Sequence, residues 1–252
     1  MNILHAIILG IVEGLTEFLP ISSTAHLVVA NRLLAIPITD FVKSFDIIIQ
    51  LGAILAVVIL YLRRLLLDRV TFQKIVVAFF PTAIVGLLLY PLVKNNLLGN
   101  LKVIAYALLI GGIVMIIFEH TRQSKKAEQH ISYFRAFMIG IFQSLAIIPG
   151  VSRAGATIIG GQSLGVSRKT IVEFSFLLAI PTMMAASGLD LIKSNIHFNS
   201  SEWLLLAVGF ISAFITALFA VRFFLRYIEN HSFSVFGWYR IIIGLLILFF
   251  LV

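Results

Sequence analysis

Long apolar runs separated by short polar stretches are the main pattern along the chain. A helix that crosses a bilayer needs about 20 mainly apolar residues. Runs close to this length lie at 45–62, 76–93, 101–118, 174–192, 203–221 and 235–252. The pattern therefore predicts six transmembrane helices.

Two further apolar stretches, 3–34 and 135–164, are broken near the middle by proline, glycine and small polar residues. The first is interrupted by LPISSTA and the second by IPGVSRAGAT. Irregular backbone at membrane depth is tolerated only where protein or a water-filled cavity surrounds it. We therefore predict two re-entrant helix-loop-helix hairpins, each of which enters and leaves on the same side.

The two broken stretches also resemble each other. GIVEGLTEFLPISS at 10–23 aligns with GIFQSLAIIPGVSR at 140–153, which places Glu13 opposite Gln143. Each half of the chain then contains one hairpin, which does not change sides, and three spans, which do. Because an odd number of crossings inverts the second half, the sequence predicts an inverted-topology repeat whose two broken loops meet near the midplane.

The predicted fold class is an all-α membrane protein with six transmembrane helices plus two re-entrant helix-loop-helix hairpins. We expect a single integral membrane domain, 1–252. Its halves cover about 1–120 and about 131–252, and the polar stretch 119–135 joins them.

Composition and charge favour the same class. Hydrophobic residues make up 60% of the chain and charged residues 12%, with a mean hydropathy of +1.08, values far outside the range of soluble domains. The net charge of +8 comes from Lys and Arg in short loops, so we expect the lipid bilayer and no nucleic acid as a partner. The absence of cysteine excludes disulfides and thiolate metal sites.

Orientation follows from the distribution of Lys and Arg. Twelve of these residues fall on one predicted side, in the loops 63–74, 119–135, 165–172 and 222–233, and five fall on the other. Because the richer side is usually cytoplasmic, we expect both termini and the opening of the first hairpin on the outer side.

Glu13 and Glu17 are the first candidates for chemistry. They are four residues apart, so their carboxylates share one face of a helix and repel each other unless a metal ion, an arginine or a proton lies between them. Their oxygen ligands suit Mg²⁺ or Ca²⁺, and the chain has neither the cysteines nor the paired histidines of a zinc site. The structural alternative is a protonated carboxyl bonded to a neighbouring helix.

Arg153 is the candidate anion clamp, because a guanidinium matches phosphate oxygens with a planar fork of donors. Gly150 and Gly155 allow the backbone around it to turn tightly and to aim N–H groups at an anion. Ser152 and Thr157 add hydroxyl donors. The alternative is an arginine that extends to the membrane interface.

Ser23 is a candidate nucleophile and His26 its candidate partner. They are three residues apart, which on a helical turn allows the imidazole to hold or take the hydroxyl proton. Ser22 and Thr24, taken alone, are typical of a helix N-terminal cap. Direct attack by water with a glutamate as base fits the same residues, and the two routes stay open.

Three segments carry a resemblance to a known family. EGLTEFLPISSTAH at 13–26, PGVSRAGAT at 149–157 and GQSLGVSRKTIVEFSFLLAIPTM at 161–183 are similar to motifs of the undecaprenyl pyrophosphate phosphatases of bacteria, the bacitracin-resistance type. Length, motif spacing and the duplicated plan are similar over essentially the whole chain. One departure is Ala154, where the family usually has serine, so a catalytic duty at that position is in doubt here.

The resemblance implies hydrolysis of undecaprenyl (C55 isoprenyl) diphosphate to the monophosphate and inorganic phosphate, which recycles the lipid carrier for cell-wall synthesis. It implies a multi-pass protein of the bacterial inner membrane, a polyprenyl diphosphate partner and a divalent cation, Mg²⁺ or Ca²⁺, held by Glu13 and Glu17. The site residues it implies are catalytic Glu13, Glu17, Ser23, His26 and Arg153, and substrate-binding Ser22, Thr24, Gly150, Ser152, Arg153, Gly155 and Thr157.

Another phosphatase mechanism and another function are the alternatives. The lipid phosphatases of the acid phosphatase superfamily need a histidine downstream of Ser-Arg, and none lies between Arg153 and Glu173, so that mechanism is disfavoured. A lipid-phosphate flippase or transporter uses the same plan of inverted repeats and broken helices, and is the alternative function. An isologous homodimer is only the common default for such proteins.

Overall fold

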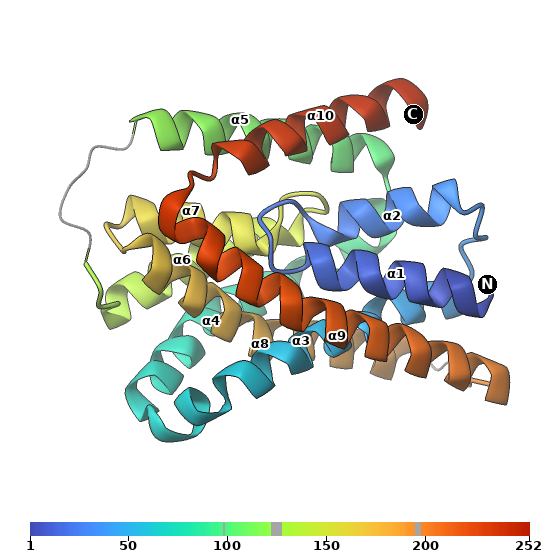
Figure 1. The fold of residues 1–252 in the computed structure, drawn as a ribbon, viewed down its shortest axis with the longest axis horizontal. Coiled ribbons are helices and arrows are strands. Elements are labelled where there is room, and N and C mark those ends of the chain that lie inside the picture. The colour runs from blue at the N-terminus through green and yellow to red at the C-terminus, as the bar shows by residue number, and fades with distance from the viewer. Residues whose placement is uncertain (98, 122–127, 195–197) are drawn as a thin grey trace.

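The computed structural model describes residues 1–97, 99–121, 128–194 and 198–252, and in these residues the regular structure is helical, with no strand. Part of the predicted joining loop, 122–127, lies outside the described residues. The helices are α1 Ile3–Thr16, α2 Ser23–Leu33, α3 Asp40–Leu67, α4 Arg69–Leu92, α5 Leu101–Thr121, α6 Tyr133–Ser144, α7 Arg153–Ser163, α8 Arg168–Ser194, α9 Ser200–Asn230 and α10 Ser234–Phe250, with the π-helical turn η1 Val93–Leu97 and the 3₁₀ turn η2 Leu145–Ile147 (Figure 1).

Five helices, α3, α4, α5, α8 and α9, are long and apolar enough to cross a membrane. They correspond to the first five predicted spans. The sixth predicted span is α10, whose 17 residues cover about 25 Å, less than the hydrocarbon thickness of about 30 Å. The prediction is therefore confirmed for five helices, and the sixth span stays a prediction.

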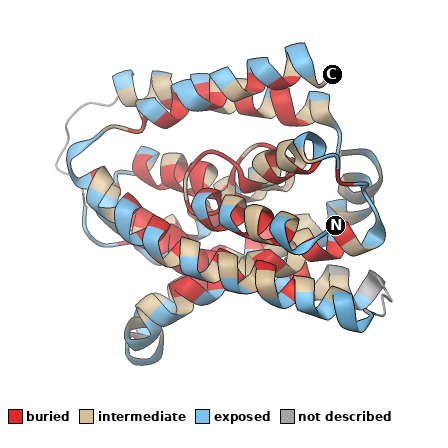
Figure 2. Cartoon of the chain, turned by 45° about the vertical axis from the view of Figure 1, so that its right-hand side comes forward, coloured by how far each residue is buried: buried red, intermediate tan, exposed pale blue. Residues whose placement is uncertain are grey.

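The outer faces of these helices carry large apolar side chains. Leu88 of α4 is 74% exposed and Phe219 of α9 is 65% exposed, and Figure 2 shows exposed positions along the outward sides of the long helices. In water such a surface promotes association, whereas in a bilayer it is the surface that contacts lipid.

Polar residues define where the long helices begin. Asn199 and Glu202 form a reciprocal capping box at the start of α9. Between α3 and α4 the Asp68 carboxylate accepts hydrogen bonds from the hydroxyl and the backbone N–H of Thr71, which hold the pKa of Asp68 below its ordinary value. The chain therefore turns sharply at Asp68 between two spans.

The two broken stretches adopt one local conformation. Each contains a first helix, an irregular loop and a second helix of 11 residues, α2 or α7. The residues that precede the second helices, Ser22 and Ser152, both have φ of +73°, a region that residues other than glycine rarely occupy. The sequence similarity between the two stretches is thus matched by the same unusual backbone at the same position.

The hairpins are packed into the opposite halves of the chain. Helix α1 packs mainly on α9, and α6 packs on α4. The approach is close at Gly140 of α6, where an added Cβ would lie 2.0 Å from the carbonyl oxygen of Ala78. Helices α5 and α10 pair along their length and form a separate layer (Figure 1).

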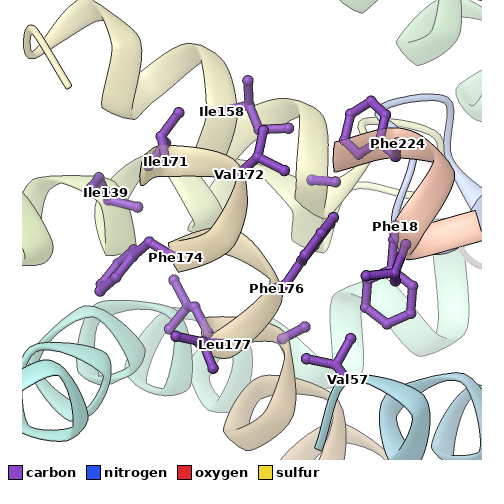
Figure 3. Close-up of a cluster of buried hydrophobic side chains, with 14 of the residues drawn as sticks. Phe18, Val57, Ile139, Ile158, Ile171, Val172, Phe174, Phe176, Leu177 and Phe224 are labelled. Atoms are coloured by element: carbon purple, nitrogen blue, oxygen red, sulfur yellow. The ribbon is translucent and has the colours of Figure 1, made fainter. Parts of the chain in front are cut away.

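An aromatic core lies directly beside the first broken loop. The Phe18 ring meets Phe176 edge to face, with ring centroids 5.3 Å apart, and Phe176 in turn contacts Phe224. Val57 and Leu177 belong to the same buried cluster (Figure 3). Because Phe18 follows Glu17 in the chain, burial of its ring fixes the end of α1 and the start of the loop.

Candidate active site

Glu17 lies where the two broken segments meet. One of its carboxylate oxygens, Oε1, accepts a hydrogen bond from Nη2 of Arg153 at 3.1 Å, and the other, Oε2, accepts from the Ser23 hydroxyl at 2.6 Å. The Glu17 and Arg153 side chains are only 4% and 8% exposed. The ion pair therefore connects the first hairpin to the second inside the protein.

Arg153 is the first residue of α7, and its guanidinium is held from three directions. Nη1 donates to the carbonyl oxygen of Ser175 at 2.7 Å and to the Ser175 hydroxyl at 3.2 Å. The guanidinium carbon lies 5.9 Å from the Phe18 ring centroid. Its Nε is buried, and no described residue accepts a hydrogen bond from it. This N–H therefore has no acceptor among the described residues.

Thr157 supports Arg153 through Ser175. Its hydroxyl lies 2.7 Å from the Ser175 hydroxyl and 3.0 Å from the carbonyl oxygen of Arg153, and the residue is fully buried. The sequence predicts Thr157 as a substrate-binding hydroxyl. The contacts place it beneath the arginine, because a hydroxyl one turn along α7 reaches back to the carbonyls of that helix.

Glu13 is fully buried one turn before Glu17, and neither of its carboxylate oxygens has a hydrogen-bond partner in the described part of the chain. A carboxylate in such a place requires a proton or a cation. Hard oxygen ligands fit Mg²⁺ or Ca²⁺. Among the described residues no group of three or more His, Asp or Glu side chains forms a metal cluster, so Glu13 and Glu17 are the residues that would hold such a cation.

The expected pairing of Ser23 with His26 is not found. The Ser23 hydroxyl donates to Glu17, whereas the His26 Nδ1 lies 2.7 Å from the carbonyl oxygen of Ser22, and Nε2 lies 2.7 Å from the Tyr239 hydroxyl. With Nδ1–H as the donor, Nε2 accepts from the phenol. Ser23 is at the first position of α2 and faces back to α1, while His26 points to α10, which explains the difference.

The other predicted site residues shape the two loops. The Ser152 hydroxyl accepts from the backbone N–H of Gly155 at 3.1 Å and so caps α7. Gly150 has φ of +95° and lies against the backbone of α5, where a side chain would not fit. Ser22 holds His26 through its carbonyl oxygen, and Thr24 is half-buried in the first turn of α2.

Tyr239 and Arg240 of α10 contact the site region and are not among the site residues predicted from the sequence. The signal was present for Arg240, which is a lone charged residue within the apolar run 235–252. Ionisable residues inside such runs usually have an interior role.

The fold and this site define a class: a helical, multi-pass membrane protein in which two broken helices bring buried carboxylates against an arginine. The family pattern described as bacitracin resistance protein BacA matches residues 6–246, and the chain belongs to this family.

Several similar proteins are named undecaprenyl-diphosphatase. The one from Aquifex aeolicus is 54% identical over 96% of this chain and 95% of its own length. Those from Wolinella succinogenes and Thermus thermophilus are 50% and 46% identical, over 100% and 98% of this chain and 99% and 96% of their own lengths.

Proposed function

We propose that this protein is an undecaprenyl-diphosphatase, a membrane phosphatase that converts undecaprenyl diphosphate into the monophosphate and inorganic phosphate. The observation that carries this is the buried ion pair between Glu17 and Arg153, beside the unpaired Glu13 carboxylate. This arrangement would offer a diphosphate both a guanidinium donor and two carboxylates that could hold a cation. The names of relatives that match nearly the full chain agree with it, and they give no support to the flippase alternative.

The proposed topology has six spans and two re-entrant hairpins in inverted repeat, in the bacterial inner membrane. The shared conformation at Ser22 and Ser152 supports the repeat. Both termini lie at one end of the molecule and the α3–α4 turn lies at the other (Figure 1), in agreement with the distribution of Lys and Arg along the sequence. The site then opens to the periplasmic side. A homodimer stays a prediction.

In the proposed mechanism, Arg153 binds the oxygens of the terminal phosphoryl group through its free Nε. Ser23 attacks the phosphorus atom and Glu17 takes the hydroxyl proton, which the 2.6 Å hydrogen bond already directs to it. The new Oγ–P bond forms as the bond from phosphorus to the bridging oxygen breaks, and undecaprenyl monophosphate leaves. Glu17 passes that proton to the departing monophosphate and is then free to act as base for a water molecule, which attacks the phosphoserine and releases inorganic phosphate while Glu17 returns a proton to the Ser23 oxygen.

A divalent cation held by Glu13 and Glu17 would neutralise the diphosphate and stabilise charge on the leaving group. His26 orients the start of α2 through the carbonyl oxygen of Ser22 and so presents the Ser23 hydroxyl. Direct attack of water activated by Glu17 uses the same residues without the covalent intermediate.

The test is phosphate release from C55 isoprenyl diphosphate by the purified protein in detergent, with Ser23→Ala and Ser163→Ala as the variant and its matched control. Ser163 is at the far end of α7 and its hydroxyl bonds to its own helix. Loss of release with Ser23→Ala, together with a phosphoserine trapped by acid quench in the wild type, supports the covalent route. Full activity of Ser23→Ala excludes Ser23 as nucleophile, and no release by folded wild-type protein overturns the function.

A further inference from the structure

Arg240 of α10 is buried, with 1% of its surface exposed, and is among the largest side chains that the protein buries completely. Its guanidinium has five N–H groups, and the structure gives them five backbone carbonyl oxygens as acceptors. The distances are 3.1 Å from Nη1 to Pro20, 2.9 Å from Nη1 to Val151, 3.0 Å from Nη2 to Gly150, 3.1 Å from Nη2 to Ala107 and 3.5 Å from Nε to Leu108.

These five carbonyls come from three different parts of the chain. Pro20 belongs to the first broken loop, Gly150 and Val151 belong to the second, and the other two lie on α5. Pro20 is three residues from both Glu17 and Ser23. Val151 is two residues before Arg153. One side chain therefore holds the backbone of both loops close to the groups that meet in the site.

We propose that Arg240 is a positioning residue that fixes the two broken loops against each other, so that Glu17 and Ser23 of the first stand opposite Arg153 of the second. The proposal rests on the proposed function and adds a residue through which α10 controls the site. Arg240 does not bind the phosphate itself, because all five of its N–H groups are already engaged by carbonyl oxygens.

The chemistry of the loops explains why arginine is required. Loop carbonyls lack the partners that a helix supplies, and an unsatisfied carbonyl at membrane depth is costly. A planar guanidinium reaches several carbonyls at once, whereas a lysine ammonium has three donors at a single point. All five partners of the guanidinium are carbonyl oxygens and none is a carboxylate. The partial negative charge of these oxygens therefore stabilises the buried cation.

Helix α5 leaves room for the guanidinium at Gly111. A Cβ added there would lie 2.2 Å from Nη2 of Arg240 and 2.8 Å from its Cζ, distances at which the guanidinium must move. Gly111→Ala therefore displaces the arginine without changing it. The matched control is Gly86→Ala in α4, where an added Cβ meets no described atom within 4 Å.

The first experiment measures kcat and KM for phosphate release from C55 isoprenyl diphosphate by the wild type, Arg240→Lys, Gly111→Ala and Gly86→Ala. Misplacement by about 1 Å can cost about 100-fold in rate, so we expect kcat to fall by about that factor in the first two variants. KM should change less than about threefold because Arg153 still binds substrate. Gly86→Ala should match the wild type.

The second experiment measures the separation of the loops directly. Because the chain has no cysteine, nitroxide labels placed by Leu15→Cys and Ile148→Cys report a single distance by pulsed electron resonance. Both positions are exposed, at 47% and 41%, and flank the two loops. In the Arg240→Lys and Gly111→Ala backgrounds the distance distribution should broaden or shift, and in the Gly86→Ala background it should not.

Several results would overturn the proposal. An unchanged distance distribution in Arg240→Lys and Gly111→Ala excludes a positioning role, whatever the activity. A loss of activity that appears only in KM indicates direct substrate contact instead. If the folded wild type releases no phosphate while the distance distribution still changes in the variants, the phosphatase function fails and the positioning role of Arg240 stands.

Discussion

Replacing Arg153 by lysine keeps a positive charge at the start of α7 but removes the fork of donors. In the structure the guanidinium reaches Glu17 through Nη2 and both oxygens of Ser175 through Nη1, while Nε is free of partners among the described residues. An ammonium group at the end of a flexible chain cannot make all these contacts at once. The substitution therefore separates the charge of Arg153 from its geometry.

The expected effects on activity and stability differ in size. Loss of one well-placed donor to the transition state costs about 3 to 4 kcal/mol, or about 100-fold to 1000-fold in kcat. Because lysine keeps the charge, we expect Arg153→Lys to lower kcat by about 100-fold, the lower end of that range. Its free energy of unfolding should fall by only about 1 kcal/mol. Arg153→Ala leaves the Glu17 carboxylate buried without its cation and should lower the free energy of unfolding by about 3 to 5 kcal/mol.

The assay is phosphate release from C55 isoprenyl diphosphate in detergent, combined with denaturant unfolding in the same detergent. Arg32→Lys serves as the control, because Arg32 is exposed in α2. Arg153→Lys protein with kcat within about threefold of the wild type would refute the role of the fork. If Arg153→Ala protein is as stable as the wild type, the Glu17 carboxylate is not buried with Arg153 as its required cation.

Three further predictions follow from the same structure. EDTA should abolish phosphate release and Mg²⁺ or Ca²⁺ should restore it, because the Glu13 oxygens lack other partners among the described residues; full activity in EDTA contradicts the cation site. Gly140→Ala should lower the free energy of unfolding by about 1 to 3 kcal/mol, since its Cβ would lie 2.0 Å from a carbonyl oxygen of α4, whereas equal stability of Gly140→Ala and Gly86→Ala would argue against that close packing. Tyr239→Phe removes the hydroxyl bonded to His26 and should lower kcat by about fivefold, equivalent to about 1 kcal/mol; unchanged kinetics would show that this hydrogen bond has no part in turnover.

The apolar runs predicted most of the fold because a bilayer imposes a simple length rule on helices. Five predicted spans match long apolar helices. The breaks around Pro20 and Pro149 also located the two irregular loops, since proline and small polar residues disfavour continuous helix. The alignment that places Glu13 opposite Gln143 predicts that the two loops meet, and in the structure the ion pair between Glu17 and Arg153 connects the two broken segments.

The hydrogen-bond partners within the site could not be predicted in the same way. Spacing along the chain placed Ser23 near His26, but the structure directs Ser23 to Glu17 and His26 to Tyr239. Spacing does not specify which way a side chain at the start of α2 turns. The packing of α10 against the loops decides it, and α10 is more than 200 residues away in sequence.

The membrane class, the broken helices and the residue types available for chemistry follow from the sequence alone, because hydropathy, helix-breaking residues and side-chain charge are local properties. The packing of the folded chain sets which of these groups share a proton or a charge. It brought Arg153 to Glu17 and gave the five N–H groups of Arg240 their carbonyl partners. Contacts of this kind depend on where several helices stop relative to one another, and that follows from the packing of the whole chain.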